Sequence, residues 1–340
     1  MAGANRYYGP RKGSLQIWPR VRAKRMYSRI RNWSINGIKD TKLLGFLGYK
    51  AGMTHIIVKD NTPNSLNKGK NLSVAATIIE CPPLKPLSIR FYKKAHDGLQ
   101  IISEIPTTKV DKELKRKVSG ISKKQNSVPE QYDDVRLMVY SQPRLTGVQK
   151  KPQIIEVGFS GTKEQKLELA KQLLEKEIKV TDIFKEGSYL DVHGISKGKG
   201  FQGTVKRYGV KIRQHKSEKV KRGIGSLGSW HPNRVLYTVA QAGRMGMHQR
   251  TDYNRFLIKI EKDVAKVNPK GGFMHYGLVK NDYLIIKGSI PGTANRPIIL
   301  TDPVRPNKKI LSYEILEINK DSKQWLKYKF IQLLELNLKN

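Results

Sequence analysis

A glycine-rich run at residues 198–203 has the residue types and spacing of a known binding chemistry. Gly198, Gly200 and Gly203 match the G-x-G-x-x-G pattern that holds a dinucleotide pyrophosphate, and an acid, Glu218, stands about twenty residues on. A dinucleotide fold requires a helix directly after the third glycine. Residues 204–213 instead alternate apolar and charged side chains, which predicts a strand. The sequence therefore argues against a dinucleotide site here.

The other residues that could perform chemistry form no catalytic pattern. Cys81 is the only cysteine, which excludes an internal disulfide and a multi-cysteine zinc site. Asp133 and Asp134 are adjacent, so on a strand they point to opposite sides and make a poor carboxylate pair. H-E-x-x-H and P-loop motifs are absent from the sequence. We expect no catalytic residue, no bound metal, no cofactor and no small-molecule substrate.

The charge of the chain points to a polyanionic partner. Lys and Arg number 65 against 28 Asp and Glu, giving a formal net charge of +37 over 340 residues. Nucleic acid is the natural counter-charge, because each phosphate neutralised by Lys or Arg releases condensed counterions. The competing membrane-surface reading needs an apolar span or a basic amphipathic helix, and the sequence has neither. With one cysteine and no secretory signal, we expect a cytoplasmic protein.

The segment 197–255 concentrates this charge in a form unlike a domain core. It holds fourteen Lys or Arg, two acids, nine glycines and three histidines, with its apolar residues scattered. This composition predicts a basic arm that leaves a folded domain and returns to it, with its tip near residues 223–232. At the tip, Trp230 could stack on a base or pack on the arm's own glycines, and the sequence leaves both open.

Residues 1–40 predict a second basic arm. They contain ten Lys or Arg, one acid and five aromatic residues, and they show neither helical nor strand periodicity. Such a segment can become ordered on a nucleic-acid partner, with its aromatic and guanidinium groups stacking on bases.

Between and after these arms, short apolar runs predict a mainly β protein. Strands are expected at 44–49, 54–58, 74–79, 88–92, 135–140, 154–159, 179–183, 189–195, 256–260, 283–286, 297–301 and 312–318. A helix is expected at 163–178, with Thr162 and Gln165 as its capping box, and a second helix at 321–336.

This pattern divides the chain into arms, barrel and insertion. The expected parts are a basic arm 1–40, barrel strands 41–104, an α/β insertion 105–178, barrel strands 179–196, a basic glycine-rich finger 197–255, barrel strands 256–320 and a C-terminal helix 321–340.

Six stretches, in order, resemble the universal large-subunit ribosomal protein L3 family in its archaeal and eukaryotic form. They are residues 13–15 (GSL), 47–55 (LGYKAGMTH), 192–203, 228–232 (GSWHP), 242–251 (AGRMGMHQRT) and 271–277 (GGFMHYG). The resemblance runs through nearly the whole chain, which makes it far more specific than any single motif.

The resemblance implies a translation-protein-type β-barrel with an α/β insertion and two extensions that enter the large-subunit rRNA. Its implied partners are this rRNA and neighbouring large-subunit ribosomal proteins, with any structural Mg²⁺ belonging to the rRNA. It implies support of subunit assembly, no chemistry, and a finger whose tip, Trp230, lies close to the peptidyl-transferase centre.

The residues that we expect to contact RNA are the cations and histidines of both arms and the tryptophan at the tip. They are Arg11, Lys12, Arg20, Arg22, Lys24, Arg25, Lys197, Lys199, Lys206, Arg207, Lys211, Arg213, His215, Lys216, Lys219, Lys221, Arg222, Trp230, His231, Arg234, Arg244, His248, Arg250 and Arg255. Two alternatives remain at this level. One is a nucleic-acid-modifying enzyme that uses His55, His193 or His275, and the other is a chromatin-type basic protein.

Overall fold

The computed structural model describes residues 20–33, 40–107, 111–118, 127–216 and 219–321. Its strands are β1 (Gly45–Asp60), β2 (Asn71–Glu80), β3 (Lys85–Ala95), β4 (Gly98–Pro106), β5 (Asp134–Tyr140), β6 (Ile154–Gly158), β7 (Tyr189–Ile195), β8 (Phe201–Gln202), β9 (Gly243–Arg244), β10 (Gln249–Glu261), β11 (Tyr283–Lys287), β12 (Pro297–Thr301) and β13 (Tyr313–Ile318). Its helices are η2 (Leu114–Arg116), α2 (Pro143–Thr146), α3 (Lys163–Leu173), η3 (Val180–Asp182), α4 (Thr204–Tyr208) and η4 (Val264–Lys266).

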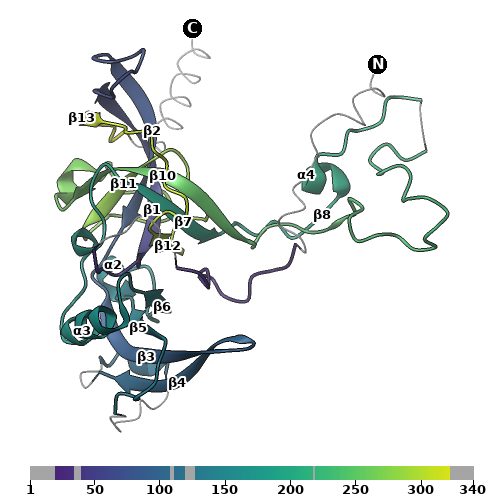
Figure 1. Cartoon of the computed structure of the whole chain (residues 1–340). Helices are drawn as coiled ribbons and strands as arrows, with labels where there is room; N and C mark the ends of the chain where they lie inside the picture. Colours follow the sequence, from purple (N-terminus) through teal and green to yellow (C-terminus); the bar gives the residue numbers. More distant parts are fainter. Residues whose placement is uncertain (1–19, 34–39, 108–110, 119–126, 217–218, 322–340) are drawn as a thin grey trace. The chain divides into compact units, whose positions relative to one another are not determined.

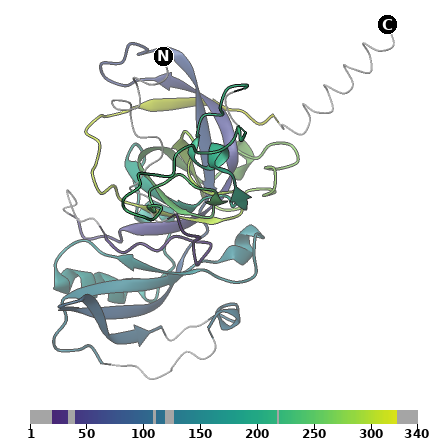
Figure 2. The ribbon, with the colours of Figure 1, turned by 90° about the vertical axis from the view of Figure 1, so that its right-hand side faces the viewer.

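The main sheet closes on itself as a barrel. Its strand order is β12-β7-β10-β11-β2-β1, and β1 pairs again with β12, so the ring has no open edge along this stretch (Figures 1 and 2). The first part of β1 pairs with β12 from Gly45 to Tyr49, and its last part pairs with β13 from Ile56 to Asp60. Closure leaves few unpaired backbone groups for other chains to bind. The predicted β-barrel is confirmed.

Strand β1 replaces two predicted strands with one. The runs 44–49 and 54–58 belong to a single strand of 16 residues, with an irregularity in its pairing to β2 between Lys50 and Gly52. Gly52 lies against a ring, because a Cβ placed there would come within 2.6 Å of Phe273 Cδ1. The glycine thus marks a close approach of another side chain inside a strand, between the two strands that the sequence predicted.

The α/β insertion lies between β2 and β7 and begins earlier than its predicted start at residue 105. Residues 85–104, predicted as part of the barrel, belong to its sheet through β3 and β4. Its four strands form an antiparallel sheet in the order β4-β3-β5-β6, shown with α3 at the bottom of Figure 1. Helix α3 packs on the core through the fully buried Ala170 and the partly buried Leu167 and Leu174. Its capping box is confirmed, with Thr162 N donating to Gln165 Oε1 at 3.2 Å. The helix ends at Leu173, five residues before the predicted end.

Two further predictions about elements have different outcomes. The strand predicted at 179–183 is wrong, because this stretch is the 3₁₀ turn η3. Lys179 N donates to Asp182 Oδ2 at 3.1 Å, and the turn buries both Val180 and Phe184 on one side. The β-branched Val180 therefore fills a position in the hydrophobic core and is not part of a strand. The helix predicted at 321–336 lies outside the described residues, apart from Asp321.

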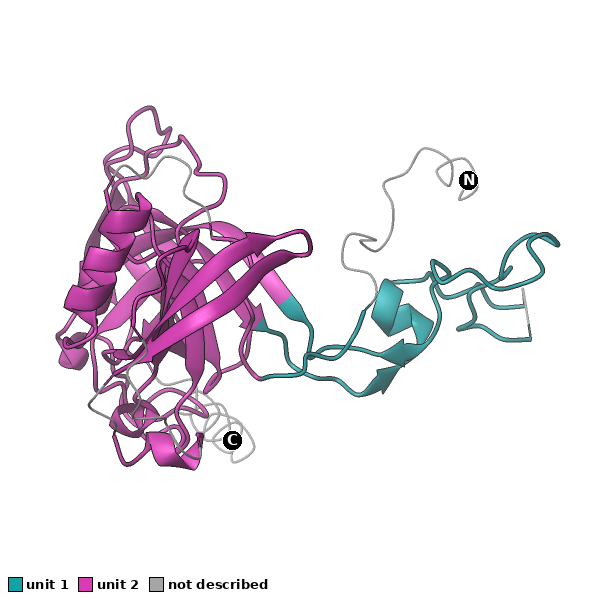
Figure 3. Ribbon diagram, turned by 60° about the horizontal axis from the view of Figure 1, so that its bottom comes forward, with its two compact units in different colours: residues 1–25, 195–249 teal, residues 26–194, 250–340 magenta. Residues whose placement is uncertain are grey.

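The chain divides into two compact units, coloured separately in Figure 3. The barrel unit contains residues 26–194 and 250–340, and the arm unit contains residues 1–25 and 195–249. The large hydrophobic clusters of the described residues, which include Phe46, Leu47 and Tyr283, draw all their members from the barrel unit. At about 1.5–3 kcal/mol for each fully buried large apolar side chain, this is where the hydrophobic stabilisation lies.

Candidate nucleic-acid interface

The arm unit begins as a two-stranded stem. Ser196 N donates to His248 O at 2.9 Å, Lys199 N donates to Met245 O at 2.9 Å, and Phe201 then pairs with Arg244 between β8 and β9. The stem narrows at Gly246, whose φ is +81° and where a Cβ would come within 2.0 Å of Lys197 O. Only glycine fits there, so the two strands can approach closely.

Beyond the stem, the chain forms a short helix where the sequence predicted a strand. Helix α4 spans five residues, Thr204–Tyr208, and ends at Gly209 with φ +68°. The strand prediction for 204–213 is therefore wrong. The physical reason is that the helix buries Thr204 and Tyr208, four residues apart, and a terminal glycine in the left-handed region stops it. A helix this short still gives no dinucleotide fold.

Arg207 braces the arm from within. Its Nη1 donates to Gln241 O at 2.8 Å and its Nε donates to Arg244 O at 3.1 Å, so it ties α4 to the returning strand. Its guanidinium also lies 5.1 Å from the centre of the Tyr208 ring. This predicted RNA-binding residue thus has a structural task, which a sequence pattern of basic residues does not reveal.

The described part of the N-terminal segment packs along the same unit. Arg20 Nη1 donates to Arg207 O at 2.9 Å, and its guanidinium lies 4.1 Å from the centre of the Tyr208 ring. His248 is buried, and its Nδ1 lies 2.7 Å from Val21 O, which makes this nitrogen the donor. The tyrosine that organises these cations was missed from the sequence, where it read as one more strand residue.

At the predicted tip, Trp230 stands in solvent. Its side chain is 87% exposed, so it does not pack on the surrounding glycines. Ser229 Oγ donates to His231 O across it, and the peptide bond between His231 and Pro232 is cis. A shallow hollow lies beside the ring, lined by residues 227–230 and 232–235. An exposed, locally braced indole offers a face for stacking.

The predicted contact residues separate by their surroundings. In the arm unit the following are exposed: Arg22, Lys24, Arg25, Lys197, Lys199, Lys206, Lys211, His215, Lys216, Lys219, Lys221, Arg222, Trp230, His231, Arg234 and Arg244. Arg20, Arg207 and Arg213 are half-buried, and His248 is buried. Arg250 and Arg255 lie on β10 in the barrel unit, where Arg255 pairs with Asp252 at 2.8 Å. Arg11 and Lys12 lie outside the described residues.

The charge of the arm unit cannot be neutralised from within. Its described residues, 20–25, 195–216 and 219–249, include sixteen Lys or Arg and no Asp or Glu. On the polar face of the insertion's sheet the opposite holds: Arg136 pairs with Glu156 at 2.9 Å and Lys166 with Asp134 at 2.8 Å. The insertion thus pairs these cations with carboxylates, whereas the described part of the arm unit contains no carboxylate to pair with its cations.

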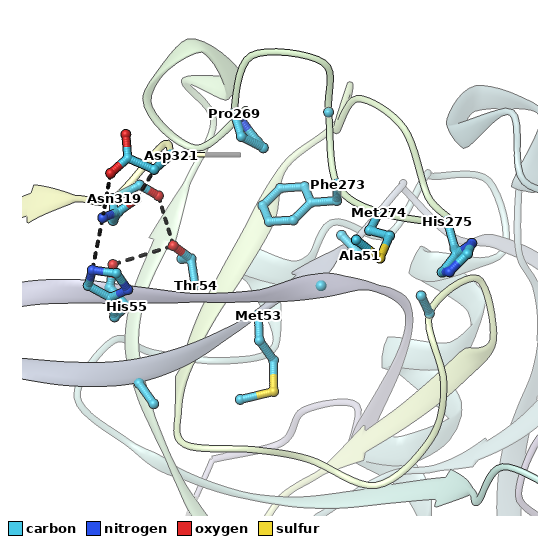
Figure 4. A pocket seen from close by; sticks show the side chains of 14 residues that line it. Ala51, Met53, Thr54, His55, Pro269, Phe273, Met274, His275, Asn319 and Asp321 are labelled. Carbon is cyan, nitrogen blue, oxygen red and sulfur yellow. Dashed lines mark hydrogen bonds between the residues drawn. The ribbon is translucent and has the colours of Figure 1, made fainter. Parts of the chain in front are cut away.

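The histidines of the enzyme alternative are not placed for catalysis. His193 is buried between two hydroxyls, with Thr251 Oγ1 at 2.9 Å and Thr301 Oγ1 at 3.0 Å. His55 and His275 lie at opposite ends of a cavity of about 550 Å³, with Phe273 between them (Figure 4). Within the part of the chain that the structure describes, no group of three or more His, Cys, Asp and Glu is placed to hold a metal ion.

The walls of the cavity in Figure 4 are mainly apolar, and its side chains form no catalytic arrangement. Met53 and Met274 contribute thioether side chains to its walls, and His55 Nε2 accepts a hydrogen bond from Asn319 Nδ2 at 2.8 Å. The thiol of Cys81, elsewhere in the barrel unit, is buried, and this burial raises its pKa well above the usual value. A thiol with a raised pKa is a poor nucleophile.

Helices long and apolar enough to cross a membrane are absent from the residues that the structure covers. The fold and the basic unit together define a class: a structural nucleic-acid-binding β-barrel protein. Comparison with known proteins gives the family.

The chain matches the family described as Ribosomal protein L3 over residues 2–128 and 117–332. It is 43% identical over 329 residues to the large ribosomal subunit protein uL3 of Methanobrevibacter smithii, covering 92% of this chain and 96% of that protein. The protein of the same name from Picrophilus torridus is 44% identical over 322 residues, covering 92% and 97%. That from Methanocaldococcus jannaschii is 41% identical over 330 residues, covering 93% and 97%.

The chain belongs to the ribosomal protein L3 family. It is a structural constituent of the large ribosomal subunit, associated with its rRNA and proteins, and it is not an enzyme. As a ribosomal protein it works in the cytoplasm. The resemblance drawn from the sequence motifs is confirmed, and the enzyme and chromatin alternatives are set aside.

Proposed function

We propose that the chain binds large-subunit rRNA through two basic extensions, residues 1–40 and 197–255, and supports assembly of the subunit. The observation that carries this proposal is the sixteen Lys or Arg, with no carboxylate, in the described part of the arm unit. RNA phosphates supply the missing counter-charge, and close strand approach at Gly246 keeps the arm thin enough to enter between RNA helices. Any structural Mg²⁺ would be held by the RNA, and neighbouring ribosomal proteins would adjoin the barrel.

We propose further that Trp230 reaches toward the peptidyl-transferase centre. Its 87% exposure supports this, because an indole that contributes nothing to a core is free to stack on a base. Base stacking of this kind contributes about 1–3 kcal/mol per base.

The experiment is sedimentation of the tagged chain through sucrose gradients at moderate salt, with wild type and Trp230→Ala side by side. We expect wild type with the large subunits. We expect the variant to melt at the wild-type temperature and to show slower subunit maturation or altered tRNA accommodation. Tyr237→Ala, which removes a ring that is 76% exposed in the same unit, is the matched control. A wild-type chain confined to free fractions would refute the first proposal; equal maturation and accommodation in both variants would refute the second.

A further inference from the structure

The loop between β12 and β13, residues 303–311, carries a basic cluster in the barrel unit. It contains Arg305, Lys308 and Lys309, and no acid interrupts the sequence between Asp302 and Glu314. All three cations are exposed. None of them forms a salt bridge within the described part of the chain, although the charge of Arg305 acts on the carboxylate of Asp191. The cluster belongs to neither basic extension, since the extensions end at residues 40 and 255.

A buried carboxylate holds the base of this loop. Asp191 on β7 is fully buried, and its Oδ2 accepts from Val304 N at 2.9 Å while its Oδ1 accepts from Asn254 N at 2.8 Å. Asn254 then reaches into the loop, where its Nδ2 donates to Arg305 O at 2.9 Å and its Oδ1 accepts from Asn307 N at 3.2 Å. The side chains of Asp191 and Asn254 thus hold the loop backbone at residues 304, 305 and 307.

The far end of the loop is fixed in the same way. Tyr189 Oη donates to Lys309 O at 2.8 Å, and Asn307 Oδ1 accepts from Lys309 N at 3.0 Å. Pro303 and Pro306 restrict the backbone further, because the proline ring locks φ. The hydrogen-bonding groups of the barrel thus hold the backbone, while the cationic side chains stay in solvent. A solvated loop has no need of this order; a binding site gains affinity from it, because little entropy remains to be lost.

An aromatic ring completes the surface. Tyr253 on β10 is 52% exposed, and the Arg305 guanidinium lies 5.9 Å from the centre of its ring. A phenol ring beside a guanidinium, next to a loop that also carries two exposed lysines, suits a ligand with both phosphates and flat bases. An acidic peptide would pair with the three cations but would not stack on the ring of Tyr253. The surface therefore favours RNA, which can do both.

We propose that residues 303–311 together with Tyr253 form a third RNA-binding site, located on the barrel unit, which takes the phosphate backbone of an rRNA segment. The inference rests on the proposed rRNA binding of this chain and extends it from the arm unit to a surface of the barrel unit.

The test is the salt dependence of binding of the full chain to purified large-subunit rRNA. Each phosphate contact contributes roughly 0.7–0.9 to the slope of log K against log salt. We expect the triple variant Arg305→Ala/Lys308→Ala/Lys309→Ala to lower the slope by about 2–3. The matched control is Lys150→Ala/Lys171→Ala/Lys176→Ala, which removes the same charge from exposed positions of the insertion and leaves the slope unchanged.

A second variant tests the ordered loop backbone separately from the charge of the loop side chains. Asn254 has φ +53°, so Asn254→Gly keeps the backbone conformation while removing both side-chain hydrogen bonds to the loop. We expect its affinity for rRNA to fall roughly two- to tenfold with no change in net charge. Equal melting temperatures of all variants will show that the barrel is intact.

The outcomes separate this inference from the proposed function. If the wild-type chain has the same affinity for duplex DNA as for rRNA, the proposed function fails. If wild type prefers rRNA but the loop triple variant matches the lysine control, this inference alone fails. Loss of a protein neighbour in subunits, with unchanged rRNA binding, would also overturn it by assigning the loop to a protein partner.

Discussion

His193 illustrates how the barrel unit handles a buried ionisable residue. Burial lowers the pKa of its imidazole to about 4, from an ordinary value near 6.5. Between these two values the unfolded chain takes up a proton that the folded chain does not. Stability therefore falls as the pH falls through this window, by up to about 3 kcal/mol. Urea unfolding of the full chain at pH 7.5, 6, 5 and 4 measures this.

The control is His193→Gln, which can hydrogen-bond to Thr251 and Thr301 without titrating. Asp191 and Asp302 have pKa values raised by burial, but they contribute equally in both proteins. We expect the difference in the free energy of unfolding between wild type and His193→Gln to become smaller, or to change sign, as the pH falls toward 4. A gap that stays constant over the whole range would contradict the assignment.

At the scale of elements, the stem of the arm unit depends on one glycine. Gly246→Ala places a Cβ within 2.0 Å of Lys197 O at a φ of +81°, so the two strands must separate. We expect the affinity for rRNA to fall about tenfold, ~1.4 kcal/mol, while the barrel unit melts as before. Binding assays and thermal melts measure the two effects. Gly203→Ala is the control, since its Cβ meets nothing within 4 Å; equal loss in both variants would refute the argument.

How far the sequence predicts these elements depends on where the deciding contacts lie. Local patterns were sufficient for the capping box at Thr162 and for most of the barrel strands, because alternation and caps act within a few residues. The sequence separates the strands 44–49 and 54–58, and it does not show that Gly52 between them is required by the ring of Phe273, more than two hundred residues away. Strand β4 was not predicted, although it contains Leu99, Ile101 and Ile102; these side chains are exposed, and the strand is set by its pairing with β3 rather than by a buried face.

The same limit applies to the candidate interface. Charge and glycine content predicted the finger as a whole, but the sequence could not show which cations turn inward. Arg207 and Lys206 are neighbours with the same charge, yet only Arg207 donates to the backbone of the returning strand. The β12–β13 loop was overlooked because its importance comes from Asp191 and Asn254, which lie far from it in the sequence.

At the scale of the whole molecule, the hydrophobic core and the proposed RNA-binding arm belong to different units. The hydrophobic clusters of the described residues lie in the barrel unit, and the described part of the arm unit contains Lys and Arg but no Asp or Glu. A variant that shortens the arm should therefore lose binding and keep its fold. Because Gln202 pairs with Gly243, residues 203–242 can be replaced by Asn-Gly as a two-residue hairpin turn.

This replacement removes nine Lys or Arg and one acid, which lowers the formal charge from +37 to +29. Thermal unfolding should occur near the wild-type temperature, because no member of the barrel's hydrophobic clusters is lost. The salt slope for rRNA binding should fall by up to about 6–8 if each removed cation meets a phosphate. A barrel that no longer folds would show that the arm contributes to stability, and an unchanged slope would show that its cations contact no RNA.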